Sequence, residues 1–164
     1  SNTAVAALYT LKERKNAPVS VLVSAVDQLL ALTTNLSSKA QTLIKTFLPG
    51  ALTVICETEF PFANQLVSAK GTVGLRIPGD GLSRKIPSIL GNPITTTSVN
   101  PAGETPATSL EEVEAYYRDQ LALMIDIGPI EQSKGSTVID LTVKPFKILR
   151  EGEITRLALQ DFLN

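Results

Sequence analysis

The sequence of 164 residues contains no histidine and a single cysteine. Without histidine the chain cannot build a Ser-His-Asp triad, a Cys-His dyad or a histidine-ligated metal site. One cysteine excludes an internal disulfide and a cysteine-rich zinc site. Cys56 ends the apolar run 52–56, so we interpret it as a core residue. The sequence therefore predicts no metal held by the protein, and the low cysteine content is compatible with a reducing cytosol.

An excess of charge of one sign is also lacking, because 15 lysines and arginines stand against 16 aspartates and glutamates. The net charge of −1 excludes a basic field over the whole surface for nucleic acid, although it leaves a local basic patch open. No apolar run approaches the roughly 18 residues needed to cross a bilayer. The opening Ser-Asn-Thr has no signal-peptide pattern. We therefore expect a cytoplasmic protein with no membrane partner.

The familiar phosphate-binding loops are missing as well. Neither G-x-x-x-x-G-K-[ST] nor G-x-G-x-x-G occurs, and the segment 134–137 (KGST) has lysine and glycine in the wrong order for the first of these. If the protein binds phosphates, it must use side-chain cations and hydroxyls.

Helix-like and strand-like segments alternate along the chain without an obvious linker. Helices are expected over 4–13, 24–32, 38–48, 82–90, 109–120 and 155–163. Strands are expected over 19–23, 52–57, 72–77, 94–99, 122–127, 136–141 and 146–150. Ser24 with Asp27, and Ser109 with Glu112, have the spacing of capping boxes, and Pro87 is expected to kink or shorten its helix. This alternation predicts one α/β domain over 1–164 with a mixed sheet, whose strand order the sequence does not reveal.

Two segments combine residues suited to binding anions. Lys12 and Arg14 stand at the end of the first helix, where two cations two positions apart converge only if the helix ends between them. The alternative is a solvated basic helix terminus, which the helix dipole favours. The hydroxyl- and amide-rich stretch 95–103 runs from a strand into a loop, a common position for ligand sites in α/β proteins. An ordinary strand followed by an Asx turn explains it equally well.

Two arginines, Arg76 and Arg150, lie within strand-like runs. A guanidinium is costly to bury without a partner, so each must point outward or into a polar cleft. A solvated edge of the sheet and an anion site are both compatible with this pattern.

Seven segments together resemble the YrdC-like family, the threonylcarbamoyl-AMP synthases. In chain order they are LKER (11–14), PVSVLV (18–23), LPGALT (48–53), TVGLRIP (72–78), TTSVN (96–100), STVIDL (136–141) and ILREG (148–152). The resemblance covers nearly the whole chain. It implies a twisted, open, mixed α/β sheet with flanking helices and a concave cleft.

The resemblance also implies an activity, that of a nucleotidyltransferase. Family members convert L-threonine, bicarbonate and ATP into L-threonylcarbamoyl-AMP and pyrophosphate, and Mg²⁺ is expected on the phosphates. A downstream transfer enzyme then passes the threonylcarbamoyl group to tRNA. Both that enzyme and tRNA itself are therefore expected partners.

The resemblance assigns roles to individual residues. The expected catalytic residues are Lys12, Arg14, Ser98 and Asn100. The expected ATP-binding residues are Lys12, Arg14, Thr72, Thr96, Ser98, Ser136 and Arg150. The expected threonine-binding residues are Arg76 and Thr137.

The sequence departs from the family pattern at several points. The opening strand of the family, Pro-Thr-Asp/Glu-Thr-x-Tyr-Gly-Leu, is absent before the helix that begins this chain, so we expect a domain without its N-terminal strand. Ala17 replaces a polar residue before Pro18, and Val99 replaces the alanine of Ser-Ala-Asn. Two alternatives to the synthase follow. One is a non-catalytic paralogue that binds nucleotide or RNA through the same cleft, and the other is a carbamoyl-transfer module of a hydrogenase-maturation protein.

Overall fold

The computed structural model describes residues 1–13 and 18–164. Its helices are α1 (Asn2–Leu11), α2 (Val26–Ala31), α3 (Ser38–Phe47), α4 (Gly81–Leu90), α5 (Leu110–Tyr117) and α6 (Arg156–Leu159). Short 3-10 turns are η1 (Asn64–Leu66), η2 (Arg118–Gln120) and η3 (Gln160–Phe162). Its strands are β1 (Ser20–Leu22), β2 (Leu52–Glu57), β3 (Thr72–Arg76), β4 (Ile94–Thr96), β5 (Thr137–Asp140) and β6 (Lys147–Arg150).

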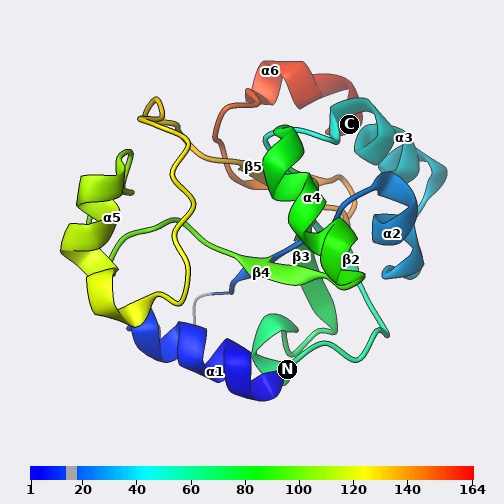
Figure 1. Ribbon diagram of the computed structural model, residues 1–164. Helices are drawn as coiled ribbons and strands as arrows, with labels where there is room; N and C mark the ends of the chain where they lie inside the picture. Colours follow the sequence, from blue (N-terminus) through cyan, green and yellow to red (C-terminus); the bar gives the residue numbers. More distant parts are fainter. Residues whose placement is uncertain (14–17) are drawn as a thin grey trace.

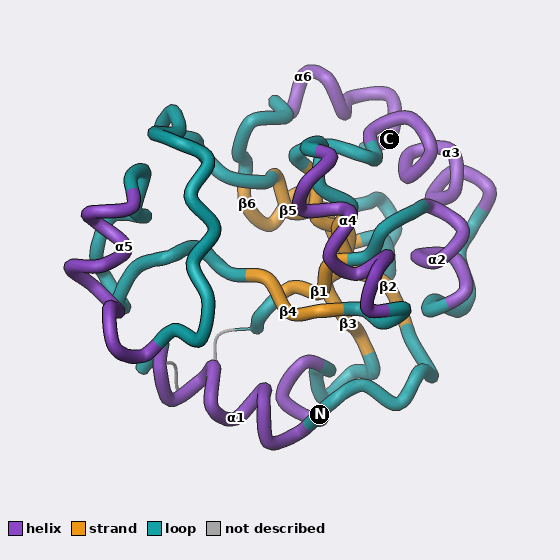
Figure 2. Tube along the Cα trace, in the orientation of Figure 1, coloured by secondary structure: helices purple, strands orange, loops and turns teal. Residues whose placement is uncertain are grey.

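The strands form one open sheet in the order β4-β1-β3-β2-β5-β6 (Figure 2). The pairs β1–β3 and β2–β5 are parallel, whereas β1–β4, β2–β3 and β5–β6 are antiparallel. This confirms the predicted mixed α/β sheet with flanking helices. In Figure 1, α2, α3 and α6 gather near the C-terminus, α1 lies near the N-terminus, and α5 stands apart from the sheet.

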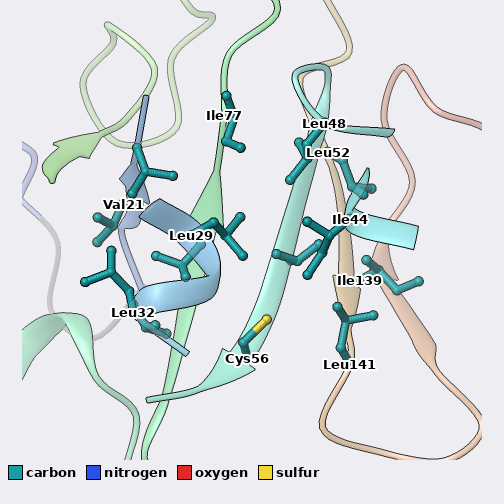
Figure 3. Packing of buried hydrophobic residues seen from close by; sticks show 14 of the residues in the cluster. Val21, Leu29, Leu32, Ile44, Leu48, Leu52, Cys56, Ile77, Ile139 and Leu141 are labelled. Atoms are coloured by element: carbon teal, nitrogen blue, oxygen red, sulfur yellow. The ribbon is translucent and has the colours of Figure 1, made fainter. Parts of the chain in front are cut away.

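Alternation along the central strands separates an apolar face of the sheet from a polar one. Val21, Leu75, Val54 and Ile139 are neighbours in register across four strands, and all are buried. Helices α2 and α3 cover this face, and their side chains point toward the strands (Figure 3). Burying a Leu or Ile side chain fully contributes roughly 1.5–3 kcal/mol, so this layer supplies most of the hydrophobic stabilisation.

Several helix boundaries follow from local side-chain chemistry. Ser37 accepts a hydrogen bond from the Ala40 amide at 3.2 Å and begins α3, which ends before Pro49. Ser109 begins α5 as predicted and accepts from the Glu112 amide at 3.4 Å. The helix α4 runs through Pro87 to Leu90, so the proline does not shorten it.

Two details of the predicted helices are wrong. The helix expected from Ser24 begins at Val26, and its N-cap, Ala25, makes no side-chain hydrogen bond; the Ser24 amide donates to Gln28 Oε1 at 2.8 Å instead of forming a capping box with Asp27. The helix expected over 155–163 keeps its α-helical form only as far as Leu159 and continues as a 3-10 turn.

The strand predicted over 122–127 is also wrong. The segment 121–130 is not assigned to any strand, although Leu123, Ile125 and Ile127 alternate as they would in one. These three side chains are exposed, and the segment borders a cavity together with residues of α4 and α5. A strand needs a neighbouring backbone to pair with as well as an alternating pattern, and the structure brings none of the described strands beside it.

No helix in the described part of the chain is long and apolar enough to cross a membrane.

The interpretation of Cys56 as a core residue is confirmed, because only 1% of its surface is exposed. Burial, together with the smaller effect of the charge of Asp140, raises the pKa of its thiol to about 12. We predict that Cys56 of the folded protein resists iodoacetamide from pH 7 to 9, because the thiolate fraction stays very small there. Mass spectrometry of intact protein should show full labelling in denaturant, and rapid labelling of the native protein would contradict the prediction.

Candidate functional site

The polar face of the sheet carries several of the residues that the sequence singled out. Leu22 of β1 pairs with Arg76 of β3, and Val54 of β2 pairs with Leu75. One step further along that antiparallel register, Thr53 lies opposite Arg76. On β4, Thr96 pairs with Ser20 at the start of β1 and is half-buried. A basic side chain and several hydroxyls therefore share the face that the hydrophobic core does not occupy.

Lys12 ties the end of α1 to the loop after β4. Its residue is 3% exposed, and its ammonium donates to the carbonyl of Ser98 at 2.7 Å and to Asn100 Oδ1 at 3.1 Å. It also donates to the Asn100 carbonyl. A buried ammonium requires such partners, because desolvation of an unpaired charge is very costly. Three of the four residues predicted as catalytic are thus in direct contact.

Arg14, the fourth predicted catalytic residue, lies outside the described residues, as does Ala17. The helix α1 ends at Leu11, and Glu13 has a positive φ of 50°, so the convergence of Lys12 and Arg14 stays a prediction.

The loop after β4 is organised by its own side chains. Ser98 Oγ donates to Asn100 Oδ1 at 2.6 Å, and Asn100 Nδ2 donates to the carbonyl of Glu104 at 2.6 Å. The Ala107 amide donates to the Val99 carbonyl at 2.8 Å. These bonds hold the loop together, and they use the Ser98 hydroxyl and the Asn100 side-chain amide as donors within it.

Arg150, at the end of β6, is held by the residue that precedes β5. Its Nη2 donates to the Ser136 carbonyl at 2.7 Å and lies 3.2 Å from Ser136 Oγ. Its Nε donates to the same carbonyl at 3.2 Å. Ser136 is 6% exposed, and its hydroxyl lies 2.8 Å from Thr53 Oγ1. These contacts join the ends of β2, β5 and β6 on the polar face.

Arg76 has an unused donor. Its Nε is buried and has no hydrogen-bond partner among the described residues. Burial lowers the pKa of this guanidinium below its ordinary value, Asp80 opposes the shift, and the charge of Arg150 adds to it. Two guanidiniums close enough to influence each other, one with a free buried donor, form an arrangement suited to an anion such as a carboxylate or phosphate.

Two other predicted residues are not brought into this group. Thr72 lies four residues before Arg76 on β3, which is about 13 Å along a strand, and its hydroxyl bonds to Ser68 Oγ at 2.7 Å. Thr137 pairs with Leu52, so its side chain lies on the apolar face of the sheet and is fully buried. Its hydroxyl donates to the Ile154 carbonyl at 2.5 Å and accepts from the Gly152 amide at 2.8 Å. Contact of Thr137 with threonine stays a prediction that this arrangement does not support.

Sequence reasoning missed Thr53, although it lies within one of the seven family segments. The available signal was a hydroxyl residue inside an otherwise apolar strand. Among the described residues, no group of three or more acidic or cysteine side chains is placed to hold a metal ion.

Comparisons with known proteins identify the family of this chain. The Sua5/YciO/YrdC family model, described as "Telomere recombination", matches residues 1–152. The chain belongs to this family. A putative threonylcarbamoyl-AMP synthase of Mycobacterium tuberculosis (strain ATCC 25618 / H37Rv) is 32% identical over 163 residues, covering 99% of this chain and 75% of that protein.

Solved structures of family members share the fold of this chain. P. abyssi Sua5 complexed with L-threonine superimposes with a TM-score of 0.91 at 26% identity, covering 99% of this chain and 48% of that one. E. coli YciO superimposes with a TM-score of 0.82 at 25% identity, covering 92% of this chain and 74% of that one. The chain therefore spans about half the length of the P. abyssi Sua5 chain.

The backbone around Ser136 leaves no space for a side chain at Gly152. A Cβ placed there would lie 2.3 Å from the Gly135 carbonyl oxygen and 2.7 Å from the Ser136 carbonyl carbon. We predict that Gly152→Ala lowers the free energy of unfolding by about 1–3 kcal/mol through overpacking, measured by urea denaturation. Gly81→Ala is the matched control, because nothing lies within 4 Å of a Cβ built there. Equal stability of the two variants would contradict the prediction.

Proposed function

We propose that this chain is a threonylcarbamoyl-AMP synthase, a nucleotidyltransferase that uses L-threonine, bicarbonate and ATP. The observation that carries the proposal is the buried Nε of Arg76, which has no hydrogen-bond partner among the described residues and lies near the charge of Arg150. Support comes from the curated relatives named threonylcarbamoyl-AMP synthase and from the P. abyssi Sua5 structure complexed with L-threonine. In this proposal Arg76 holds the threonine carboxylate.

The chemistry of the proposed reaction requires cations rather than a side-chain nucleophile. The threonine amine and bicarbonate form a carbamate with loss of water. A carbamate oxygen then forms a bond to the α-phosphorus of ATP, and the bond from that phosphorus to the β-phosphate oxygen breaks, releasing pyrophosphate. Carbamate and phosphate are both anions, so the site must hold like charges together, and charged donors and positioning supply most of the catalysis in such transfers.

The residues of the candidate site divide these tasks in the proposal. Arg150 and Ser136 interact with the nucleotide. The loop carrying Ser98 and Asn100, held by Lys12, lines the path of the phosphates. Mg²⁺ would arrive bound to ATP, because the described residues offer no acidic cluster and this ion commonly binds through phosphates and water. The product would pass to an enzyme that transfers the threonylcarbamoyl group to tRNA.

The proposed reaction predicts a specific pattern of substrate dependence. Pyrophosphate release from ATP should require threonine and bicarbonate together, and omission of either should abolish it. The measurement is a coupled pyrophosphate assay on this chain and on a chain extended at its N-terminus by the opening strand of the family, Pro-Thr-Asp/Glu-Thr-x-Tyr-Gly-Leu. Release that is unchanged without threonine would contradict the proposal. If both chains are folded and release no pyrophosphate, but bind RNA with an affinity that falls as salt rises, the non-catalytic alternative is favoured.

Lys12 is predicted to contribute strongly to this activity. Lys12→Met keeps the aliphatic stem but removes the donors that hold the 98–100 loop. Losing charge-assisted bonds in a desolvated site costs on the order of 2–4 kcal/mol, so the rate should fall by roughly 30- to 1,000-fold.

The matched control for Lys12→Met is Lys85→Met at an exposed position of α4, which should retain normal turnover. Circular dichroism and thermal unfolding would establish that both variants are folded. Near-normal turnover of folded Lys12→Met would remove this residue from the site.

A further inference from the structure

We propose that Thr53 is a positioning residue for nucleotide binding, holding Ser136 and, through it, the guanidinium of Arg150. This inference rests on the proposed function and adds a residue to the same site. Thr53 is 4% exposed, and its hydroxyl lies 2.8 Å from Ser136 Oγ in a buried contact. Ser136 in turn bonds to Arg150 through its carbonyl and its hydroxyl.

The direction of these bonds makes the three residues a connected chain. An arginine can only donate, so Ser136 Oγ accepts from Arg150 Nη2. The Ser136 hydroxyl then either donates its proton to Thr53 or accepts a second bond from it. In both cases the Thr53 hydroxyl fixes the rotamer of Ser136, and Ser136 presents two oxygens to one guanidinium.

Both branches of the Thr53 side chain, the methyl and the hydroxyl, contact a neighbouring residue. Its Cγ2 methyl lies 3.5 Å from the point where a Cβ on Gly74 would stand, so the methyl packs against the glycine of the neighbouring strand. Its hydroxyl points to Ser136 on the other side. With one branch on β3 and the other on the residue before β5, the side chain has a single favourable χ1 setting.

A role in core packing alone does not explain this residue. Its neighbours Leu52 and Val54 lie on the apolar face, whereas Thr53 lies on the polar face opposite Arg76. Valine would fill the same volume without the cost of burying a hydroxyl. The hydroxyl is therefore explained by the hydrogen-bond chain that runs through Ser136 to Arg150.

The test compares Thr53→Val, which keeps the shape, with Thr53→Ser, which keeps the hydroxyl. ATP affinity is measured by titration calorimetry without threonine, and KM values are measured by pyrophosphate release. We expect Thr53→Val to weaken ATP binding and to raise the KM for ATP about 5- to 20-fold, with the KM for threonine unchanged. Thr53→Ser should stay within about twofold of the natural protein. Thr46→Val, at an exposed position of α3, is the control for the substitution itself.

A double-mutant cycle with Ser136→Ala then asks whether Thr53 acts through that residue. Once Ser136→Ala has removed the shared hydroxyl, adding Thr53→Val should weaken ATP binding no further. Fully additive losses would overturn the proposal, and so would equal behaviour of Thr53→Val and Thr53→Ser. An unchanged ATP affinity in Thr53→Val would overturn it as well.

The calorimetric measurement separates this proposal from the proposed reaction. If the natural chain binds ATP but releases no threonine-dependent pyrophosphate, the proposed reaction fails, and the affinities of the Thr53 variants still decide the role of Thr53. If the natural chain binds no ATP, the role of Thr53 is refuted directly.

Discussion

Alternation of side chains along β2 and β3 is the constraint on which the rest of the structure depends. Val54 and Leu75 face the helices that cover the sheet, and Thr53 and Arg76 face the other way. The apolar face provides the stability, and the strands that it anchors hold the polar groups in place. A displacement of one residue in register would exchange the two faces and bury a guanidinium in the core. The stability of the core and the geometry of the site are therefore specified by the same register.

The local structure could largely be predicted from the sequence where one short segment contains the whole signal. Ser109 begins a helix because its hydroxyl accepts from an amide three residues later, and Cys56 is buried because it ends a run of strand-forming residues. The prediction failed where the outcome depends on a distant partner. The segment 122–127 has the alternation of a strand, yet no described strand lies beside it. Gln28 rather than Asp27 reaches back to Ser24, a choice of one residue that spacing alone does not decide.

The candidate site was predictable in part for the same reason. The family resemblance linked Lys12 to Ser98 and Asn100, which lie far apart in the sequence, and the structure brings them into contact. Arg76 could be identified because a cation inside a strand needs a polar environment. Ser136 and Thr137 both carry a hydroxyl, but they are consecutive where the strand begins and so point to opposite faces. The hydroxyl of Thr137 therefore lies on the apolar face of the sheet. Thr53 was missed because its importance lies in a bond to a residue 83 positions away.

The free donor of Arg76 also affects the folded state as a whole. The polar face carries the guanidiniums of Arg76 and Arg150, and among the described residues the buried Nε of Arg76 has no hydrogen-bond partner. In the proposed function, an anion that binds there would accept from this N–H and would bind the folded chain in preference to the unfolded one. The resistance of the protein to heat is then coupled to the concentration of its own ligand, increasing as RT ln(1 + [L]/Kd). In a cell, the supply of substrate would thus help to set the amount of folded protein.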